Sequence, residues 1–188
     1  MKRLIVGITG ASGVIYGIRA LEMLRAAGYE THLVLSPAAR VTIAQETDWK
    51  IGEVEALASV HHDHRDVGAS IASGSFATQG MLIAPCSIKT LSAVAHSYSS
   101  DLLTRAADVC LKEGRPLLLM VRETPLHKGH LKLMLAAADA GAILFPPAPA
   151  FYGRPQTLDD LITATVGRAL ARLGVENSGY FEWKGMGR

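Results

Sequence analysis

An adjacent arginine and glutamate, Arg122 and Glu123, directly follow the apolar run PLLLMV, at the point where a buried strand would end. An arginine binds phosphate through parallel hydrogen bonds, and a carboxylate takes up or returns a proton. Because neighbouring residues leaving a strand point to opposite sides, we expect the two side chains to serve different contacts. The alternative, which this pair taken alone favours, is a local ion pair at the end of the sheet.

A glycine-rich turn, GITGASGVIYG, follows the first apolar run. Small residues at such a turn let backbone N–H groups approach an anion, although glycines there are often purely structural. Val14 and Tyr16 stand where a dinucleotide fingerprint requires glycine, and no Gly-Lys-Ser/Thr follows. The turn is therefore not typical of a nicotinamide dinucleotide site or of a nucleoside-triphosphate P-loop.

Hydroxyl side chains recur where the predicted helices begin. Ser36 precedes a proline in LVLSPAAR, Ser87 begins SIKT with Thr90 one turn further on, and Ser12 lies in the glycine-rich turn. Serine is a common N-cap, and an acid would stand in place of Ser36 in most nicotinamide enzymes. Three such ends around one crevice predict a polar ligand that carries phosphate.

Alternating apolar runs and helical patterns must position these residues. The strand candidates are RLIVGIT, THLVLS, GMLIAP, PLLLMV and AILFPP, separated by helical patterns that often end at glycine. This order predicts an α/β, Rossmann-like (flavodoxin-like) open parallel sheet flanked by helices on both faces. Ligands of such sheets bind at the carboxyl ends of the strands. With no repeat and no linker, we expect a single domain over residues 1–188.

Composition narrows the possible partners. Of 188 residues, 49% are hydrophobic and 19% charged, which suggests that other subunits cover part of the surface. The net charge of +2 gives no reason to expect nucleic acid. Cys86 and Cys110 lie in apolar segments and are interpreted as small core residues. The apolar run in the first residues, MKRLIVGITGASG, is shorter than that of a signal peptide. No segment approaches the roughly 20 apolar residues of a membrane span. We therefore expect a cytoplasmic protein.

Two further segments carry candidate residues. The proline-stiffened loop FPPAPAFYGRP presents Tyr152 as part of a substrate wall. The cluster HHDHR, with His61, His62 and His64, lacks zinc-ligand spacing and is interpreted as a solvated loop, so no metal is expected.

These segments together resemble the flavin prenyltransferase family, the UbiX type within the flavin-containing cysteine decarboxylase superfamily. The resemblance runs nearly end to end. Its most specific parts are LLTRAADVCLKEGRPLLLMVRETPLH and PPAPAFYGRP.

The resemblance implies an activity and partners. It implies a metal-independent prenyltransferase that joins a dimethylallyl group, from dimethylallyl phosphate, to N5 and C6 of reduced FMN. The product, prenylated FMN, would serve UbiD-type decarboxylases, including those of ubiquinone biosynthesis. The family also implies a homo-oligomer, a dodecamer.

The resemblance assigns roles to individual residues. It implies that FMN is bound by Gly10, Ala11, Ser12, Ser36, Ser87, Ile88, Lys89, Thr90 and Arg122. It implies catalytic roles for Glu123, Glu46 and Ser12. The prenyl phosphate would be bound by Tyr152, Arg168, Arg105 and Lys112, with Trp183 in a tail of about residues 174–188 that closes over the site.

Arg105 and Lys112 raise a geometric difficulty. Seven residues apart on one predicted helix, they share a face but lie about 10 Å apart along it. Two cations at that spacing do not hold one phosphate from a single helix, so we expect the site to form where subunits meet. Asp108 shares their face, and a solvated ion-pair stripe is the alternative.

One segment departs from the family pattern, and two other functions are possible for a chain of this kind. In AVAHSYSSDLL the family commonly has glycine after the alanine and Asp-Asn before the leucines, whereas this chain has His96 and SSD. The rivals are an FMN carrier and a flavin-dependent decarboxylase of the same superfamily. A carrier would need no second phosphate site, and the decarboxylase would need an early histidine base, whereas His32 falls within a predicted strand.

Overall fold

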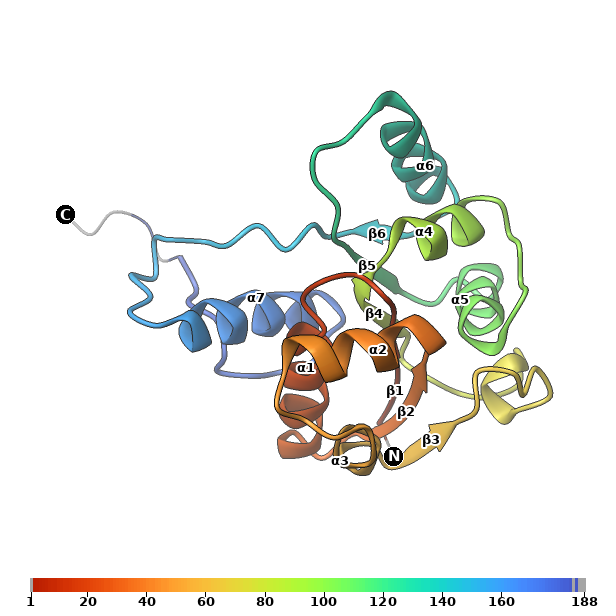
Figure 1. Ribbon diagram of the computed structural model, residues 1–188, viewed down its shortest axis with the longest axis horizontal. Helices are drawn as coiled ribbons and strands as arrows, with labels where there is room; N and C mark the ends of the chain where they lie inside the picture. The colour runs from red at the N-terminus through yellow and green to blue at the C-terminus, as the bar shows by residue number, and fades with distance from the viewer. Residues whose placement is uncertain (1, 184, 186–188) are drawn as a thin grey trace.

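The computed structural model describes residues 2–183 and 185. Met1, Lys184 and residues 186–188 lie outside the described residues, so the predicted domain of 1–188 and its tail of about 174–188 are described only in part. Figure 1 shows the helices arranged around a central sheet.

The sheet contains six strands, and all its pairs are parallel. Its spatial order is β3-β2-β1-β4-β5-β6, the order of a doubly wound Rossmann fold. The strands are β1 (Arg3–Ile8), β2 (Glu30–Leu35), β3 (Val60–His62), β4 (Met81–Cys86), β5 (Leu117–Val121) and β6 (Ile143–Leu144). The five expected strands are confirmed. β3 was not expected, because its short VHH sequence gives no apolar run.

Helices cover both faces of the sheet, as predicted. On one face lie α1 (Ile15–Ala26), α2 (Pro37–Glu46), α3 (Ile51–Leu57) and α7 (Leu158–Arg172). On the other lie α4 (Ile88–Ala95), α5 (Leu102–Lys112), α6 (Lys128–Asp139) and, beside α5, the short 3-10 turn η1 (Ser70–Ala72). Of these helices α3 alone has no counterpart among the six predicted helical patterns.

Strand residues alternate between two cores, because successive side chains of a strand point to opposite faces. In β1, Leu4 and Val6 pack under α1 and α7, whereas Ile5 packs on the side of α5. Cys86 and Cys110 are buried free thiols, as expected. Burial raises the pKa of Cys110 to about 12, so this thiol is unreactive near neutral pH.

A long arm, residues 145–157, leaves β6 and runs away from the sheet to α7 (Figure 1). The chain after α7 returns alongside this arm as the tail, residues 174–183. Among the described residues, none of the helices combines the length and apolar character needed to cross a bilayer.

Candidate active site

The end of β1 is locked against the start of α2. A Cβ added to Gly10 would lie 2.2 Å from the Cβ of Ala38, so only glycine fits this close approach. The backbone N–H of Ser36 donates to the carbonyl oxygen of Ile8 at 3.0 Å. The Ser36 hydroxyl accepts from the N–H of Ala39 at 3.1 Å, which confirms it as the N-cap of α2.

Ser87 occupies the same position at the start of α4. Its hydroxyl accepts from the N–H of Thr90 at 3.3 Å and donates to the Thr90 hydroxyl at 3.2 Å. Thr90 is buried, Ile88 is half-buried and Lys89 is exposed on the first turn. The sheet order reverses between β1 and β4, so the turns at 10–12 and 87–90 flank the switch point where such folds bind ligands.

Ser12 differs from these serines because it does not cap its helix. α1 begins at Ile15, and its N-cap position, Val14, has no side-chain cap. Ser12 instead lies beside the carboxylate of Glu46, which stands at the end of α2, and helps to lower the pKa of that carboxylate. Ser12 therefore lies beside the start of α1, as expected, without capping that helix.

Glu46 binds the turn before α1 directly. Its Oε2 accepts from the N–H of Gly13 at 2.7 Å, where a φ of +95° favours glycine. Burial opposes ionisation of Glu46, but hydrogen bonds from Ser12, Gly13 and Val14, together with the charge of Arg122, outweigh it and lower its pKa. A carboxylate thus neutralises the positive end of α1.

Arg122 and Glu123 line the same cavity, of about 530 Å³. β5 ends at Val121, and the alternation of side chains does not apply beyond the strand. The two side chains form no ion pair with each other among the described residues. Glu123 accepts from the N–H of Thr124 at 3.0 Å. This strand-end cavity is also lined by Ser12, Gly13, Tyr16, Val121, Thr124, Pro146, Pro147 and Ala148.

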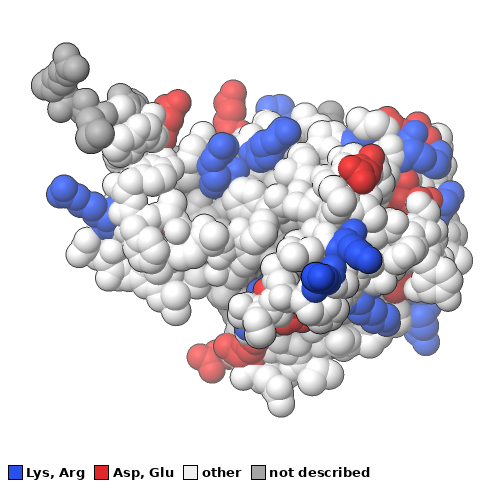
Figure 2. Space-filling view, turned by 90° about the horizontal axis from the view of Figure 1, so that it is seen from above, with Lys and Arg blue, Asp and Glu red and all other residues white. Residues whose placement is uncertain are grey.

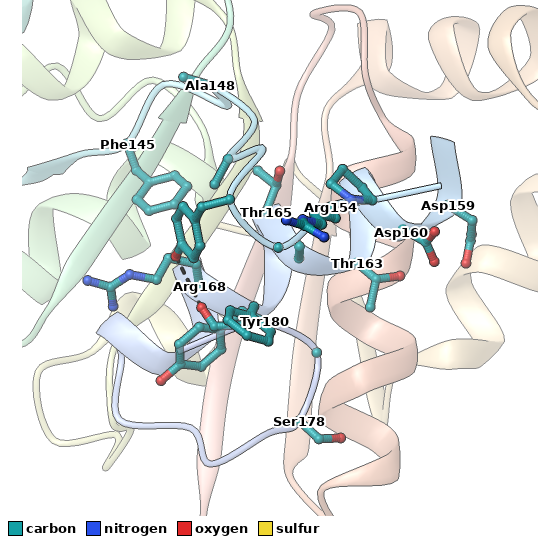
Figure 3. Close-up of a pocket in the computed structure, with 17 residues that line it drawn as sticks. Phe145, Ala148, Arg154, Asp159, Asp160, Thr163, Thr165, Arg168, Ser178 and Tyr180 are labelled. Carbon is teal, nitrogen blue, oxygen red and sulfur yellow. Dashed lines mark hydrogen bonds between the residues drawn. The ribbon is translucent and has the colours of Figure 1, made fainter. Parts of the chain in front are cut away.

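A second cavity, of about 470 Å³, lies between the arm, α7 and the tail, and shares Ala148 with the first. Tyr152 and Arg168 both line this arm–tail cavity. Figure 3 shows Asp159 and Asp160 toward one end, and Arg168 beside Tyr180 toward the other.

The tail contacts both of the predicted phosphate-binding residues in this cavity. The Tyr152 hydroxyl donates to the carbonyl oxygen of Phe181 at 3.1 Å, and its ring centroid lies 5.7 Å from that of Trp183. The Arg168 guanidinium lies 5.8 Å from the centroid of the Tyr180 ring. Tyr152 and Arg168 thus line one cavity, and the tail contacts each of them, Trp183 at Tyr152 and Tyr180 at Arg168.

Arg105 and Lys112 lie elsewhere and line neither cavity. Arg105 donates to the carbonyl oxygen of Ala72 at 3.3 Å and forms an ion pair with Asp108 at 3.2 Å. Lys112 forms an ion pair with Glu113 at the end of α5, shortly before β5 begins. A single chain does not bring these cations to Tyr152 and Arg168.

Two residues of the strand-end region were not among the site residues predicted from the sequence. Tyr16 lines the cavity, although its position was used only to exclude a dinucleotide fingerprint. Thr9, a buried polar residue at the end of an apolar run, bonds to Pro85 at the end of β4 and to Ser87 directly after it. A threonine closing the run RLIVGIT was the available signal.

The histidines are bound separately rather than as a group. His62 lies 2.9 Å from His32, whose side chain is buried in β2 and also contacts Glu30. His61 pairs with Glu55 at 3.5 Å, and His64 with Asp63 at 3.4 Å. Across residues 2–183 and 185, no group of three or more His, Cys, Asp or Glu side chains could hold a metal ion.

The unusual segment AVAHSYSSDLL connects α4 and α5. His96 ends α4, exposed, with its Nδ1 2.7 Å from the carbonyl oxygen of Ser92. The next residue, Ser97, has a φ of 50°, in the left-handed region that favours glycine. The departure from the family pattern therefore falls at a strained turn, and neither cavity is lined by it.

Comparison with known proteins identifies the class. The sequence model of the Flavoprotein family matches residues 1–168, so the chain is a member of that family. It is 64% identical over 176 residues to "Flavin prenyltransferase UbiX" of Escherichia coli, covering 93% of each chain. It is 60% identical over 188 residues to the protein of the same name from Salmonella typhimurium, covering 98% of this chain and 100% of the relative.

Solved structures agree. A crystal structure of AnUbiX in complex with FMN and dimethylallyl pyrophosphate matches with a TM-score of 0.97 and 45% identity, covering 99% of both chains. A dodecameric FMN-dependent UbiX-like decarboxylase from Escherichia coli O157:H7 matches with a TM-score of 0.94 and 46% identity, covering 97% and 100%. The chain belongs to the UbiX flavin prenyltransferase family, which confirms the resemblance.

More distant structures share the fold alone. The cysteine decarboxylase TvaF matches with a TM-score of 0.66 at 14% identity. This similarity gives no support to the rival decarboxylase function.

Proposed function

We propose that this chain is a metal-independent flavin prenyltransferase that joins a dimethylallyl group, from dimethylallyl phosphate, to N5 and C6 of reduced FMN. The observation that carries the proposal is the pair of adjoining cavities. One contains Ser12, Arg122 and Glu123, with Glu46 bonded to its wall, and the other contains Tyr152 and Arg168. The 64% identity to a flavin prenyltransferase supports it.

FMN would bind at the strand ends. The turn at 10–12, the N-cap Ser36, the first turn of α4 and Arg122 supply hydroxyl, backbone and guanidinium donors there. Reduced FMN supplies the electron-rich ring atoms N5 and C6. The small side chains of the turn at 10–12 would let a large, flat ligand approach the backbone there.

Tyr152 and Arg168 would stabilise the departing phosphate. When the C–O bond of dimethylallyl phosphate breaks, its electron pair leaves with the phosphate, and positive charge develops on the allyl group. A cation and a hydroxyl donor on the phosphate oxygens lower the energy of that separation. Because the Tyr152 hydroxyl has one hydrogen, donation to phosphate replaces its bond to the Phe181 carbonyl.

Glu123 would handle the proton lost when the new ring closes. It lines the strand-end cavity and accepts a single hydrogen bond, from Thr124, so its carboxylate has acceptor capacity left. The departing phosphate is an alternative base. The pKa of Glu46 is lowered, so its carboxylate stays ionised near neutral pH beside Ser12 at the cavity wall.

A complete phosphate site would need more than one subunit. Arg105 and Lys112 lie outside both cavities, so we assign them to the site of a neighbouring copy in a dodecamer. Exposed apolar side chains, including Leu131, Leu135 and Phe151, are suited to contact between copies. The UbiX-like relative of known structure from Escherichia coli O157:H7 is dodecameric.

Subunit complementation tests this assembly. Lys112→Ala and Arg168→Ala chains should each be nearly inactive alone, and co-expression should restore part of the activity because some sites then receive both native residues. If the mixed dodecamer forms but stays inactive, the two residues are not supplied to one site by different subunits, and the assignment is wrong.

The remaining assignments follow from the same proposal. The chain would act as one flavin-binding domain over 1–188, with the tail of about 174–188 closing over the site. Prenylated FMN would pass in the cytoplasm to a UbiD-type decarboxylase, including that of ubiquinone biosynthesis. On the face seen in Figure 2, Lys/Arg and Asp/Glu side chains are interspersed rather than gathered into one basic patch, in keeping with a small-molecule substrate.

The decisive experiment is mass spectrometry of the flavin after anaerobic incubation with reduced FMN and dimethylallyl phosphate. We expect a flavin heavier by one prenyl unit. In Glu123→Gln the yield should fall by about 100- to 10,000-fold while FMN still binds, since one acid–base group is lost. Bound but unmodified FMN in the unmutated protein would contradict the proposal and favour an FMN carrier or the superfamily decarboxylase.

A further inference from the structure

We infer that Thr9 is a positioning residue for flavin binding, because its buried hydroxyl fixes the turn at 10–12 relative to the turn at 87–90. These turns come from the ends of β1 and β4, neighbouring strands at the centre of the sheet (Figure 1). The inference rests on the proposed function, in which both turns bind FMN.

The regular pairing of β1 with β4 ends before the two turns begin. The register of β1 with β4 ends at Gly7 and Ile83. β4 is then irregular between Ile83 and Cys86, and Pro85 has no N–H with which to continue a ladder. Beyond Gly7, another contact has to hold the two strand ends together.

Thr9 supplies that contact. Its hydroxyl donates to the carbonyl oxygen of Pro85 at 2.7 Å and accepts from the N–H of Ser87 at 2.8 Å. Its own N–H donates to the same Pro85 oxygen at 3.3 Å. Thr9 is 1% exposed, so water does not replace these bonds.

The link connects residues with assigned roles on both sides. Thr9 precedes Gly10 directly, and Ser87 is the N-cap of α4. The link extends to the third strand end, because the N–H of Arg122 donates to the carbonyl oxygen of Cys86 at 3.1 Å. Movement at Thr9 would therefore shift the FMN donors of β1 and β4 relative to each other.

The test compares variants at Thr9. Thr9→Val keeps the shape but removes both side-chain bonds, and it should raise the Kd for FMN by about tenfold or more. Thr9→Ser keeps the hydroxyl, and its Kd should stay within about threefold of the unmutated protein. Flavin fluorescence titration measures both. The KM for dimethylallyl phosphate at saturating FMN should stay within about threefold, because Tyr152 and Arg168 lie in the other cavity.

Thr31→Val is the matched control. Thr31 is also 1% exposed, and its hydroxyl accepts from the N–H of Ser59 at 3.1 Å, near the start of β2 rather than at the strand ends. We expect it to lower thermal stability about as much as Thr9→Val while leaving the Kd for FMN within about twofold.

The outcomes separate a positioning role of Thr9 in FMN binding from a purely structural role. If Thr9→Val binds FMN as the unmutated protein does, or if Thr9→Ser binds as weakly as Thr9→Val, the inference is wrong. If Thr9→Val does not fold, Thr9→Cys, whose sulfur bonds weakly, replaces it and should bind FMN more weakly than Thr9→Ser. Failure of the unmutated protein to bind FMN would instead overturn the proposed function.

Discussion

The strand-end cavity and the arm–tail cavity adjoin at Ala148, yet different forces hold them. The first is fixed by hydrogen bonds at the ends of β1, β4 and β5, directly above two buried cores. The second is enclosed by the arm and the tail, where Tyr152 is 47% exposed and Trp183 is 56% exposed. It is held by aromatic contacts and by hydrogen bonds from the Tyr152 hydroxyl to the carbonyl oxygen of Phe181 and from the Asn177 amide to the carbonyl oxygen of Gly167 in α7.

The contrast suggests a division of labour. A preformed site suits FMN, since a large ligand bound in a fixed orientation presents its reacting ring atoms reproducibly. A site whose donors are bonded to the chain's own tail suits a smaller substrate, which must enter, displace those contacts and leave as free phosphate. Variants in one cavity should therefore affect one ligand and spare the other.

The largest effect should come from Arg168→Ala. Loss of a charged donor from the phosphate should raise the KM for dimethylallyl phosphate by about 10- to 100-fold, with the Kd for FMN unchanged. Steady-state kinetics and flavin titration measure the two quantities. Arg154→Ala, a cation lining the same cavity without an assigned role, is the control and should have little effect. If the Kd for FMN rose as much as the KM for dimethylallyl phosphate, the two cavities would not bind separate ligands.

Tyr152→Phe should have a smaller effect in the same direction. It removes a neutral hydroxyl donor and also its bond to Phe181, so substrate loses one contact but no longer has to displace the tail. We expect the KM for dimethylallyl phosphate to rise by about three- to tenfold. A fall in KM would mean that the hydroxyl serves the tail alone.

Glu46→Gln should sharpen the contrast through pH. Because the folded-state pKa of Glu46 is lowered from 4.5, its contribution to stability is present above pH 4.5 and is lost as pH falls through the folded value. Near neutral pH the variant should be less stable by about 0.3–1 kcal/mol, the usual effect of a charge at an exposed helix end. Urea denaturation of both proteins from pH 7 to pH 3 should show this difference shrinking. A pH-independent difference would contradict the charge argument.

Ser97→Gly tests a site outside both cavities and gives a baseline. Relief of its left-handed φ of 50° should stabilise the protein by about 0.5–1 kcal/mol, measured by thermal denaturation. FMN binding and the KM for dimethylallyl phosphate should both stay as they are. A change in either would extend the site to the segment between α4 and α5.

The elements were largely predictable because their signals are local. Apolar runs marked five strands, and helical patterns, several of them ending at glycine, marked six helices. β3 was missed because VHH becomes a strand by pairing with β2, and α3 because a seven-residue helix gives only a short pattern. The N-caps Ser36 and Ser87 were recognisable, since a cap depends on residues within one turn.

The sequence indicated which residues belong to the candidate site but not which contacts they make. Arg122 and Glu123 were expected to serve different contacts, and only the fold shows that both line one cavity just beyond the end of β5 at Val121. Ser12 was expected at the start of a helix, and only the fold shows that it lies beside Glu46, which is 34 residues away in sequence. No local pattern indicates a contact of that kind.

The sequence by itself determined the order of strands and helices, the family and the residue types available for phosphate, proton and flavin chemistry. These depend on periodicity, on caps and on motif spacing, all of which are written along the chain. Only the tertiary structure decided that Glu46 binds the start of α1, that Thr9 bridges β1 and β4, and that Tyr152 and Arg168 contact the tail. Those contacts arise where the packed sheet brings distant segments within hydrogen-bonding range.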